Sequence, residues 1–312
     1  MRTVASGEHI PVLLDEVMVA LITSPDGFYV DCTFGRGGHT RELLDRLGPN
    51  GRVLGLDQDP STHETAGLLE SEDQRFEFES VTFERLSEVV RRRGLYGKVT
   101  GVLFDLGVSS PQLDRPERGF SFRTDGPLDM RMDPRVGEPA SRFVNTADET
   151  ELTRVLKVYG EERHAKRIAR AIGVARQERP IETTGRLAEL VSAAVPRPPP
   201  GRRESRIHPA TKTFQALRIL VNRELDAFTN ALAELPDMLA PLGRLVVISF
   251  HSLEDRIAKR FIRDRAKKPN DPFTELGTRL RPLGRHQRPS EAEAERNPRA
   301  RSAVLRAAER VA

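Results

Sequence analysis

Strand-like and helix-like segments alternate along the first third of this 312-residue chain. Short runs of β-branched and aromatic residues are each followed by a stretch with apolar residues at helical spacing. Such alternation builds right-handed βαβ units, so it predicts a mostly parallel, doubly wound α/β sheet. The predicted strands are 28–34, 52–56, 75–80 and 99–104, and the predicted helices are 39–47, 61–70 and 83–93.

The alternation stops after Asp114 and resumes near residue 209. Between these points the chain is first rich in Pro and Gly, then carries two apolar stripes at helical spacing, and ends in the proline-rich run 196–201. Such a segment can continue neither a helix nor a central strand. The pattern predicts a helical domain over 115–208, inserted between two parts of the α/β domain, 1–114 and 209–312.

The α/β pattern returns after the insertion. Apolar residues at steps of three and four from Phe214 to Leu235 predict one long helix that Pro236 stops. The segments that follow predict a strand, a helix and a last strand, over 244–250, 252–266 and 303–311.

Charge and cysteine content narrow the class of protein. The one cysteine, Cys32, allows no intrachain disulfide and no cysteine-rich zinc site. Apolar stretches are too short and too often interrupted by charges for a membrane span or a secretory signal, so we expect a cytoplasmic protein. The net charge is only +4, yet residues 256–288 hold eleven Lys and Arg against three acids. Basic density of this kind attracts a phosphate backbone, although it is also typical of a solvated surface.

A glycine-rich turn follows the first predicted strand and precedes a helix. Gly35, Gly37 and Gly38 allow close approach of a ligand to the backbone, and Asp57 ends the next strand 20 residues after Gly37. A dinucleotide fingerprint would need Gly where Thr40 stands, and no P-loop lysine follows. The turn therefore favours a methionine-derived nucleoside cofactor over NAD or a nucleoside triphosphate; a plain tight turn is the alternative.

Asp105 ends the fourth predicted strand, at the edge where doubly wound sheets bind ligands. A carboxylate there can accept hydrogen bonds from an exocyclic amine of cytosine or adenine and position it for methyl transfer. Ser109 and Ser110 follow it in the same loop. The structural alternatives are a loop cap for Asp105 and a simple turn for the serines.

His251 follows the later strand at the same edge and is a candidate substrate contact. Ser252 and Asp255 after it have the spacing of a helix capping box, which is the structural alternative for this motif. His208 and Lys212, at the junction with the insertion, are candidate phosphate or base contacts, or simply the start of a helix.

Several kinds of chemistry are disfavoured. Methylation at cytosine C5 needs a cysteine nucleophile, and Cys32 lies in the strand that enters the glycine-rich turn. The seven histidines show no metal-ligand spacing, so no metal site is predicted.

Nine short blocks follow one another along the chain: GRGGHT (35–40), LDQDP (56–60), DLGVSSPQLD (105–114), RGFSF (118–122), PLDMRMD (127–133), YGEE (159–162), HPATKTFQALRI (208–219), FHSLEDR (250–256) and NPRARSAVLR (297–306). In this order they resemble the bacterial RsmH (MraW) methyltransferase family. The resemblance covers nearly the whole chain and implies a Rossmann-like class I methyltransferase fold with an inserted helical domain. It implies S-adenosylmethionine as cofactor and methylation of a cytosine N4 in the decoding region (P site) of 16S rRNA, in the small ribosomal subunit.

The resemblance also implies roles for individual residues. Gly37, Gly38 and His39 would hold the methionine end of the cofactor, and Asp57 its ribose. Phe83 would lie near the adenine, while Asp105 and Gln112 would close the site.

For catalysis and RNA binding the sequence suggests two further sets of residues. Asp105, with Ser109, Ser110 and His251, would orient the cytosine amine. The basic residues near the end of the insertion would contact RNA phosphates, namely Arg202, Arg203, Arg206, His208 and Lys212.

Two other functions remain open on the sequence alone: a methyltransferase for a small molecule or a protein, and a non-catalytic RNA-binding assembly factor. Whether the chain forms a homodimer is also open.

Overall fold

The computed structural model describes residues 11–196, 208–266 and 279–311. It divides into two compact units, one formed by residues 1–107 with 225–312, the other by Val108–Glu224. The domain boundaries predicted from the sequence, after Asp114 and after His208, both lie inside the second unit. Each unit has its own hydrophobic core.

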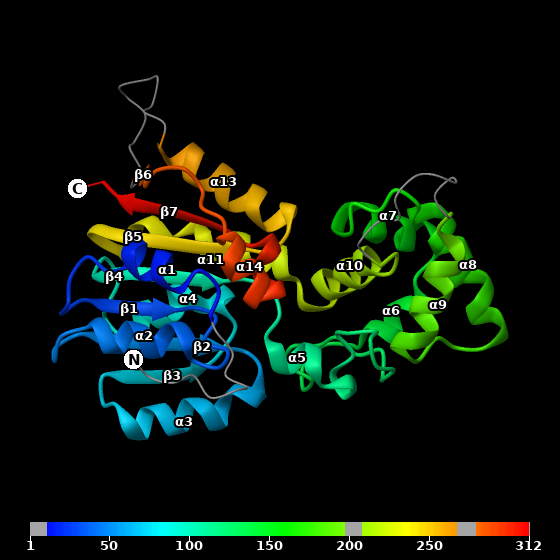
Figure 1. Cartoon of the computed structure of the whole chain (residues 1–312), viewed down its shortest axis with the longest axis horizontal. Coiled ribbons are helices and arrows are strands. Elements are labelled where there is room, and N and C mark those ends of the chain that lie inside the picture. Colours follow the sequence, from blue (N-terminus) through cyan, green and yellow to red (C-terminus); the bar gives the residue numbers. More distant parts are fainter. Residues whose placement is uncertain (1–10, 197–207, 267–278, 312) are drawn as a thin grey trace. The chain divides into compact units, whose positions relative to one another are not determined.

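The first unit is built on a seven-stranded sheet in the order β3-β2-β1-β4-β5-β7-β6 (Figure 1). The first five strands in this order are parallel, while β7 is antiparallel to both β5 and β6. The predicted doubly wound α/β sheet is thereby confirmed. The strands are β1 (Phe28–Asp31), β2 (Arg52–Asp57), β3 (Phe76–Ser80), β4 (Val99–Asp105), β5 (Leu239–Ser249), β6 (Leu280–Pro282) and β7 (Val304–Arg310).

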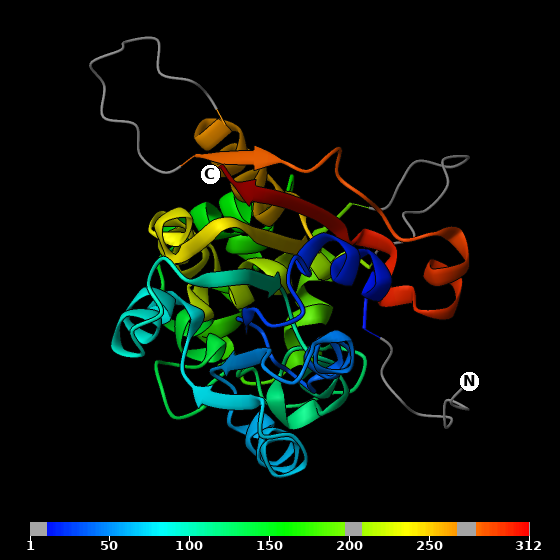
Figure 2. The same cartoon turned by 90° about the vertical axis from the view of Figure 1, so that its left-hand side faces the viewer.

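Helices cover both faces of this sheet (Figure 2). Side chains alternate between the faces of a strand, so Tyr29 joins the core on one face and Val30 the core on the other. One face is covered by α1 (Leu14–Leu21), α2 (Gly38–Arg46) and α3 (His63–Glu72), and the other by α4 (Leu86–Arg92), α11 (Glu224–Ala233), α12 (Leu235–Met238) and α13 (Ser252–Ala266).

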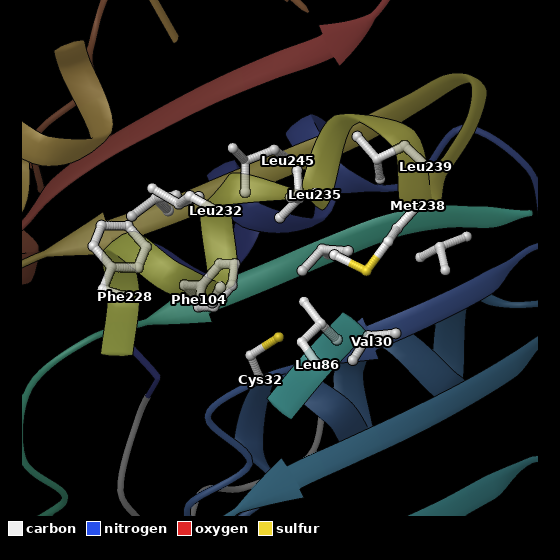
Figure 3. Packing of buried hydrophobic residues seen from close by; sticks show 14 of the residues in the cluster. Val30, Cys32, Leu86, Phe104, Phe228, Leu232, Leu235, Met238, Leu239 and Leu245 are labelled. Carbon is white, nitrogen blue, oxygen red and sulfur yellow. The ribbon is translucent and has the colours of Figure 1, made fainter. Parts of the chain in front are cut away.

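The core on the α11 face consists mainly of aliphatic side chains that surround an edge-to-face pair of phenylalanine rings (Figure 3). The ring centroids of Phe104, on β4, and Phe228, on α11, lie 5.3 Å apart. Leu232 follows one helical turn after Phe228 and is 1% exposed. Packing at helical spacing thus attaches α11 to the middle of the sheet.

The second unit is helical. Its core gathers the apolar stripes of five helices around Phe120, Leu128 and Met130 from the preceding loops. The stripe of α8 is absent from the sequence-based prediction, yet Ile168 and Ile172 are fully enclosed. The helices are α5 (Ser110–Asp114), α6 (Ala140–Thr146), α7 (Glu149–Tyr159), α8 (Ala165–Glu178), α9 (Thr184–Ala194) and α10 (Thr211–Asn222).

The predicted single helix from Phe214 to Leu235 is wrong. The chain breaks at Arg223, which has a left-handed φ of 50° and separates α10 from α11. Both helices have an apolar stripe, since α10 buries its stripe in the core of the second unit and α11 in the core of the first. The apolar spacing therefore continues across the break and hides it in the sequence. Pro236 belongs to the first turn of α12.

The predicted first strand, 28–34, is also too long. β1 ends at Asp31, and residues 32–34 lead into the glycine-rich turn although their side chains favour a strand. Among the described helices, none combines the length and the apolar character that a membrane crossing requires.

We expect Leu232→Ala to lower the free energy of unfolding of the first unit by about 2–5 kcal/mol, because it removes a fully buried side chain from a packed core. The matched control is Leu68→Ala on α3, where the side chain is 56% exposed and the change should be within about 0.5 kcal/mol. Urea unfolding followed by circular dichroism measures both. Equal losses of stability in the two variants would contradict the described core.

Candidate active site

Three aspartates lie at the carboxyl ends of three neighbouring strands: Asp57 on β2, Asp31 on β1 and Asp105 on β4. Parallel strands end at the same edge of a sheet, so their last residues come together. The sequence pattern predicts Asp57 and Asp105 as site residues. Asp31 is missing from that prediction, although its signal is the same: an acid at the end of a buried run.

The glycine-rich turn between β1 and α2 has backbone angles that side chains rarely adopt. Gly35 and Gly37 have φ of +53° and +71°. A Cβ at Gly37 would also lie 2.8 Å from ring atoms of Phe34. Glycine is therefore required at position 37 for both conformation and space.

Asp57 is joined to this turn by hydrogen bonds. Its Oδ2 accepts the N–H of Gly35 at 2.8 Å, and its Oδ1 accepts the N–H of Asp59 at 2.9 Å. Burial raises the pKa of Asp57 to about 6, against the lowering effect of these two hydrogen bonds. The side chain is only partly covered, so its oxygens can still accept a ligand hydroxyl.

His39 connects the turn to Asp105. Its Nε2 lies 3.0 Å from the carbonyl oxygen of Val12, and its Nδ1 lies 3.5 Å from Oδ2 of Asp105. A carbonyl only accepts, so Nε2 carries a hydrogen and Nδ1 is the atom that faces the carboxylate. The buried ring is thereby held in one orientation.

The backbone of Asp105 is fixed by a hydrogen bond, while one oxygen of its carboxylate has no partner among the described residues. Its N–H donates to Oγ1 of Thr33 at 2.7 Å. Its Oδ1 is buried and has no hydrogen-bond partner among the described residues. An unsatisfied buried acceptor costs about 1–3 kcal/mol, and such atoms in native proteins often mark ligand sites.

The charge environment of Asp105 is acidic. Burial is the main cause that raises its pKa to about 6; the nearby carboxylates of Asp31 and Glu254 raise it further, and His39 opposes the shift. An acidic edge of this kind favours a cationic ligand group.

Asp31 stabilises the turn through hydrogen bonds to its buried carboxylate. It is 2% exposed, and its Oδ2 accepts the hydroxyl of Thr40 at 2.8 Å while its Oδ1 accepts the N–H of Thr33 at 3.1 Å. Burial raises its pKa. Thr40, which takes the place of the third glycine of a dinucleotide fingerprint, thus has a structural role in this turn.

His251 follows β5 and is fixed by Glu254, whose buried carboxylate accepts the N–H groups of Phe250 and His251 at 2.8 and 3.2 Å. The His251 Nε2 lies 3.1 Å from Glu254 Oε1. A capping box of Ser252 with Asp255 is wrong, because Ser252 is already helical and Asp255 pairs with Arg306 at 2.7 Å. The cap comes from His251 and Glu254 instead: His251 Nδ1 accepts the N–H of Glu254 at 3.4 Å, and the Glu254 carboxylate accepts the N–H of His251 in return.

Phe83 and Cys32 have well-defined surroundings in the first unit. Phe83 follows β3, and its ring centroid lies 5.6 Å from that of Phe104 in an edge-to-face contact. The Phe83 side chain remains partly exposed. Cys32 is buried, and burial raises the pKa of its thiol. A thiol held in this form is a poor nucleophile, in agreement with the exclusion of a cysteine mechanism.

Residues of the second unit that the sequence proposed for the site have local structural partners. Ser109 and Gln112 form the capping box of α5, with the N–H of Ser109 donating to Gln112 Oε1 at 2.9 Å, and Ser110 is the first residue of that helix. The His208 ring lies 4.6 Å from that of Phe122, and Lys212 Nζ donates to the carbonyl of Glu161 at 2.9 Å. Arg202, Arg203 and Arg206 lie outside the described residues.

The sheet order with an antiparallel β7, together with a glycine-rich turn and acids at the strand ends, defines a class I methyltransferase. The model of the MraW methylase family matches residues 6–311, so the chain belongs to that family.

Curated relatives agree with this assignment. Proteins named ribosomal RNA small subunit methyltransferase H are 54% identical in Thioalkalivibrio sulfidiphilus, over 97% of this chain and 98% of that protein, and 52% identical in Coxiella burnetii, over 97% and 99%. An rRNA methylase structure from Streptococcus thermophilus is much more distant, with 11% identity and a TM-score of 0.41 over 96% of this chain and 94% of that one. Neither the comparisons nor the described part of the chain supports a homodimer, and we do not propose one.

Asp105→Asn should stabilise the protein at high pH. The folded pKa of Asp105 lies above the ordinary value, so the stability of the wild type falls as pH rises from about 4 through about 6, whereas Asn cannot ionise. We expect a gain on the order of 1 kcal/mol at pH 8, or about 2–4 °C in melting temperature, and none at pH 4.

Thermal melts of the cofactor-free protein at the two pH values test this expectation. Asp45→Asn, at an exposed site on α2, is the control. A gain at pH 8 that is equally large at pH 4 would contradict the buried, ionisable carboxylate.

Proposed function

We propose that this chain is an S-adenosylmethionine-dependent methyltransferase that methylates N4 of a cytosine in 16S rRNA, in the decoding region at the P site of the small ribosomal subunit. The observation that carries the proposal is Asp105, an incompletely paired carboxylate beside a glycine-rich turn. The family match and the names of the relatives support the ribosomal RNA substrate.

The residues of the first unit fit this cofactor. When bound, S-adenosylmethionine supplies an electrophilic methyl group on a cationic sulfur. Gly37, Gly38 and His39 would hold its methionine end, where the left-handed backbone at Gly37 and the absence of side chains on both glycines expose the main chain. Asp57 would accept the ribose hydroxyls, and the partly exposed ring of Phe83 would contact the adenine.

The substrate amine needs orientation because its lone pair is delocalised into the cytosine ring. Asp105 would accept a hydrogen bond from N4 and aim it at the methyl group, with the ring of His39 beside the carboxylate, its Nδ1 3.5 Å from Oδ2. The base must leave its stack to reach an enclosed edge of this kind. Alignment and exclusion of water would supply most of the rate, and no covalent enzyme intermediate is needed.

His251, Ser109 and Ser110 would complete the substrate side, and Gln112 would close the cofactor side. The contacts described above suggest that these residues act mainly by shaping loops: Gln112 caps α5, and Glu254 holds His251. We propose the second unit as the substrate-recognition domain. Its basic end would bind RNA phosphates through Arg202, Arg203, Arg206, His208 and Lys212.

The central experiment measures transfer of labelled methyl from S-adenosylmethionine to small ribosomal subunits that lack the modification. We expect N4-methylcytidine after digestion to nucleosides, and at least about a hundredfold loss of rate in Asp105→Ala, because the amine loses its orienting acceptor. Asp45→Ala is the control for an aspartate outside the site.

Two results would contradict the proposal. If the protein binds S-adenosylmethionine and no label enters RNA, the substrate is wrong and a small molecule or a protein becomes the better candidate. If wild type and Asp105→Ala bind RNA equally and neither transfers methyl, the chain is an RNA-binding assembly factor.

Replacing Arg202, Arg203 and Arg206 together by Gln should weaken RNA binding and reduce its salt dependence. Removing one Arg–phosphate interaction should lower the slope of log affinity against log salt by about 1. Affinity for small subunits at several salt concentrations measures this. An unchanged slope with unchanged methyl transfer would show that this cluster does not contact RNA.

A further inference from the structure

We propose that a basic groove on the first unit, between α13 and β6–β7, binds the phosphate backbone of the ribosomal RNA outside the active site. The proposal rests on the function proposed above and assigns a second RNA contact, distinct from the basic end of the second unit. We call it the α13 groove. It is lined by Lys259, Ile262, Arg263, Ala266, Pro282, Gly284, Arg285, His286, Arg306 and Ala307, and its volume is about 250 Å³.

Cations surround the α13 groove, and none of the described residues that line it is an acid. Two of its four Lys and Arg residues have carboxylate partners: Arg306 pairs with Asp255 at 2.7 Å, and Arg263 with Asp264 at 3.0 Å. Lys259 and Arg285 are exposed and form no ion pair with any described residue. The groove therefore keeps a positive charge that the described part of the protein does not neutralise.

The spacing of the cations suits a chain of anions. Lys259 and Arg263 are four residues apart on α13 and project from the same side of the helix. Arg285 and His286 approach from the opposite wall, on the loop that follows β6. Two facing rows of donors can bind successive phosphates of one strand, whereas a single small anion would occupy only part of this length.

The floor of the groove argues against a protein partner. The apolar residues of its lining are Ile262, Ala266, Pro282 and Ala307, none of them aromatic, and a Cβ at Gly284 would meet nothing within 4 Å. A protein interface of standard size needs a larger apolar centre with aromatic anchors. A sugar–phosphate backbone needs cationic donors and no such apolar centre.

The position of the groove places this contact away from the chemistry. α13 starts at Ser252, next to the carboxyl edge that carries the aspartates, and runs away from it. At 1.5 Å per residue, Lys259 and Arg263 lie roughly 10 and 16 Å along the helix. Arg306 is opposite Val247, inside β5 rather than at its end. The groove would therefore bind RNA flanking the methylated base and leave the methyl-transfer step itself unaffected.

The test compares Lys259→Glu/Arg285→Glu with a matched control, Arg52→Glu/Lys98→Glu. The control changes the same residue types and the same charge at exposed positions near the amino ends of β2 and β4. Binding to small ribosomal subunits is measured between about 50 and 200 mM salt, with methyl transfer under saturating S-adenosylmethionine and melting temperatures for both variants.

We expect the groove variant to bind at least about tenfold more weakly than wild type at low salt, with a shallower salt slope, a raised KM for the subunit and an unchanged kcat. The control should behave as wild type. Melting temperatures within a few degrees of wild type would show that both variants fold.

The inference would be overturned if the groove variant kept the affinity and the KM of the wild type. It would also be overturned if the groove variant and the control lost affinity equally, because that loss would reflect net charge alone. A lower kcat with unchanged KM would also overturn it, since a remote backbone contact acts on binding. If the wild type itself fails to methylate small subunits, the proposed function fails first; direct binding of the variants to 16S rRNA then still decides whether the α13 groove contacts RNA.

Discussion

Burial of carboxylates at one sheet edge is the constraint on which the site depends, and it raises the pKa of each of them. Asp31, Asp57 and Asp105 end neighbouring strands, so the fold that aligns the strands also crowds three acids. Each carboxylate has different partners: that of Asp31 accepts hydrogen bonds from two threonines, that of Asp57 from two backbone N–H groups, and that of Asp105 has only His39 beside it among the described residues. The least compensated of the three is the one that would meet the substrate amine, although burial raises the pKa of Asp57 and of Asp105 alike to about 6.

The glycine-rich turn follows from the same constraint. Its conformation directs the N–H of Gly35 at Asp57 and places His39 at the start of α2, within reach of Asp105. A side chain at Gly37 would press on Phe34 and disturb the turn. The hydrogen bonds of Asp57, the position of His39 and the start of α2 thus depend on the same few residues, which we also propose as cofactor contacts.

The rest of the first unit supports this edge at a distance. Phe104 precedes Asp105 and packs against Phe83 and Phe228, so the α11 core fixes the end of β4. Later in the chain, Glu254 ties the loop after β5 to the start of α13. Lys259 and Arg263 lie farther along α13, away from the strand ends. The first turn of α13 is acidic and its last turn basic. The proposed chemistry at its start and the proposed RNA contact farther along it therefore use different parts of one helix.

Much of this architecture was determined by the sequence itself. Alternating apolar patterns predicted the sheet and most of its helices, and an acid after a buried run predicted Asp57 and Asp105, because strand ends and helix faces are local properties of the chain. Tertiary structure alone decided the break at Arg223, the early end of β1, the pairing of His39 with Asp105 and the cap by Glu254. Each of these depends on which core a stripe joins or which distant group lies within hydrogen-bond reach. The spacing of apolar residues along a chain cannot contain that information. The same periodicity fits one long helix in a single core and two helices in two separate cores.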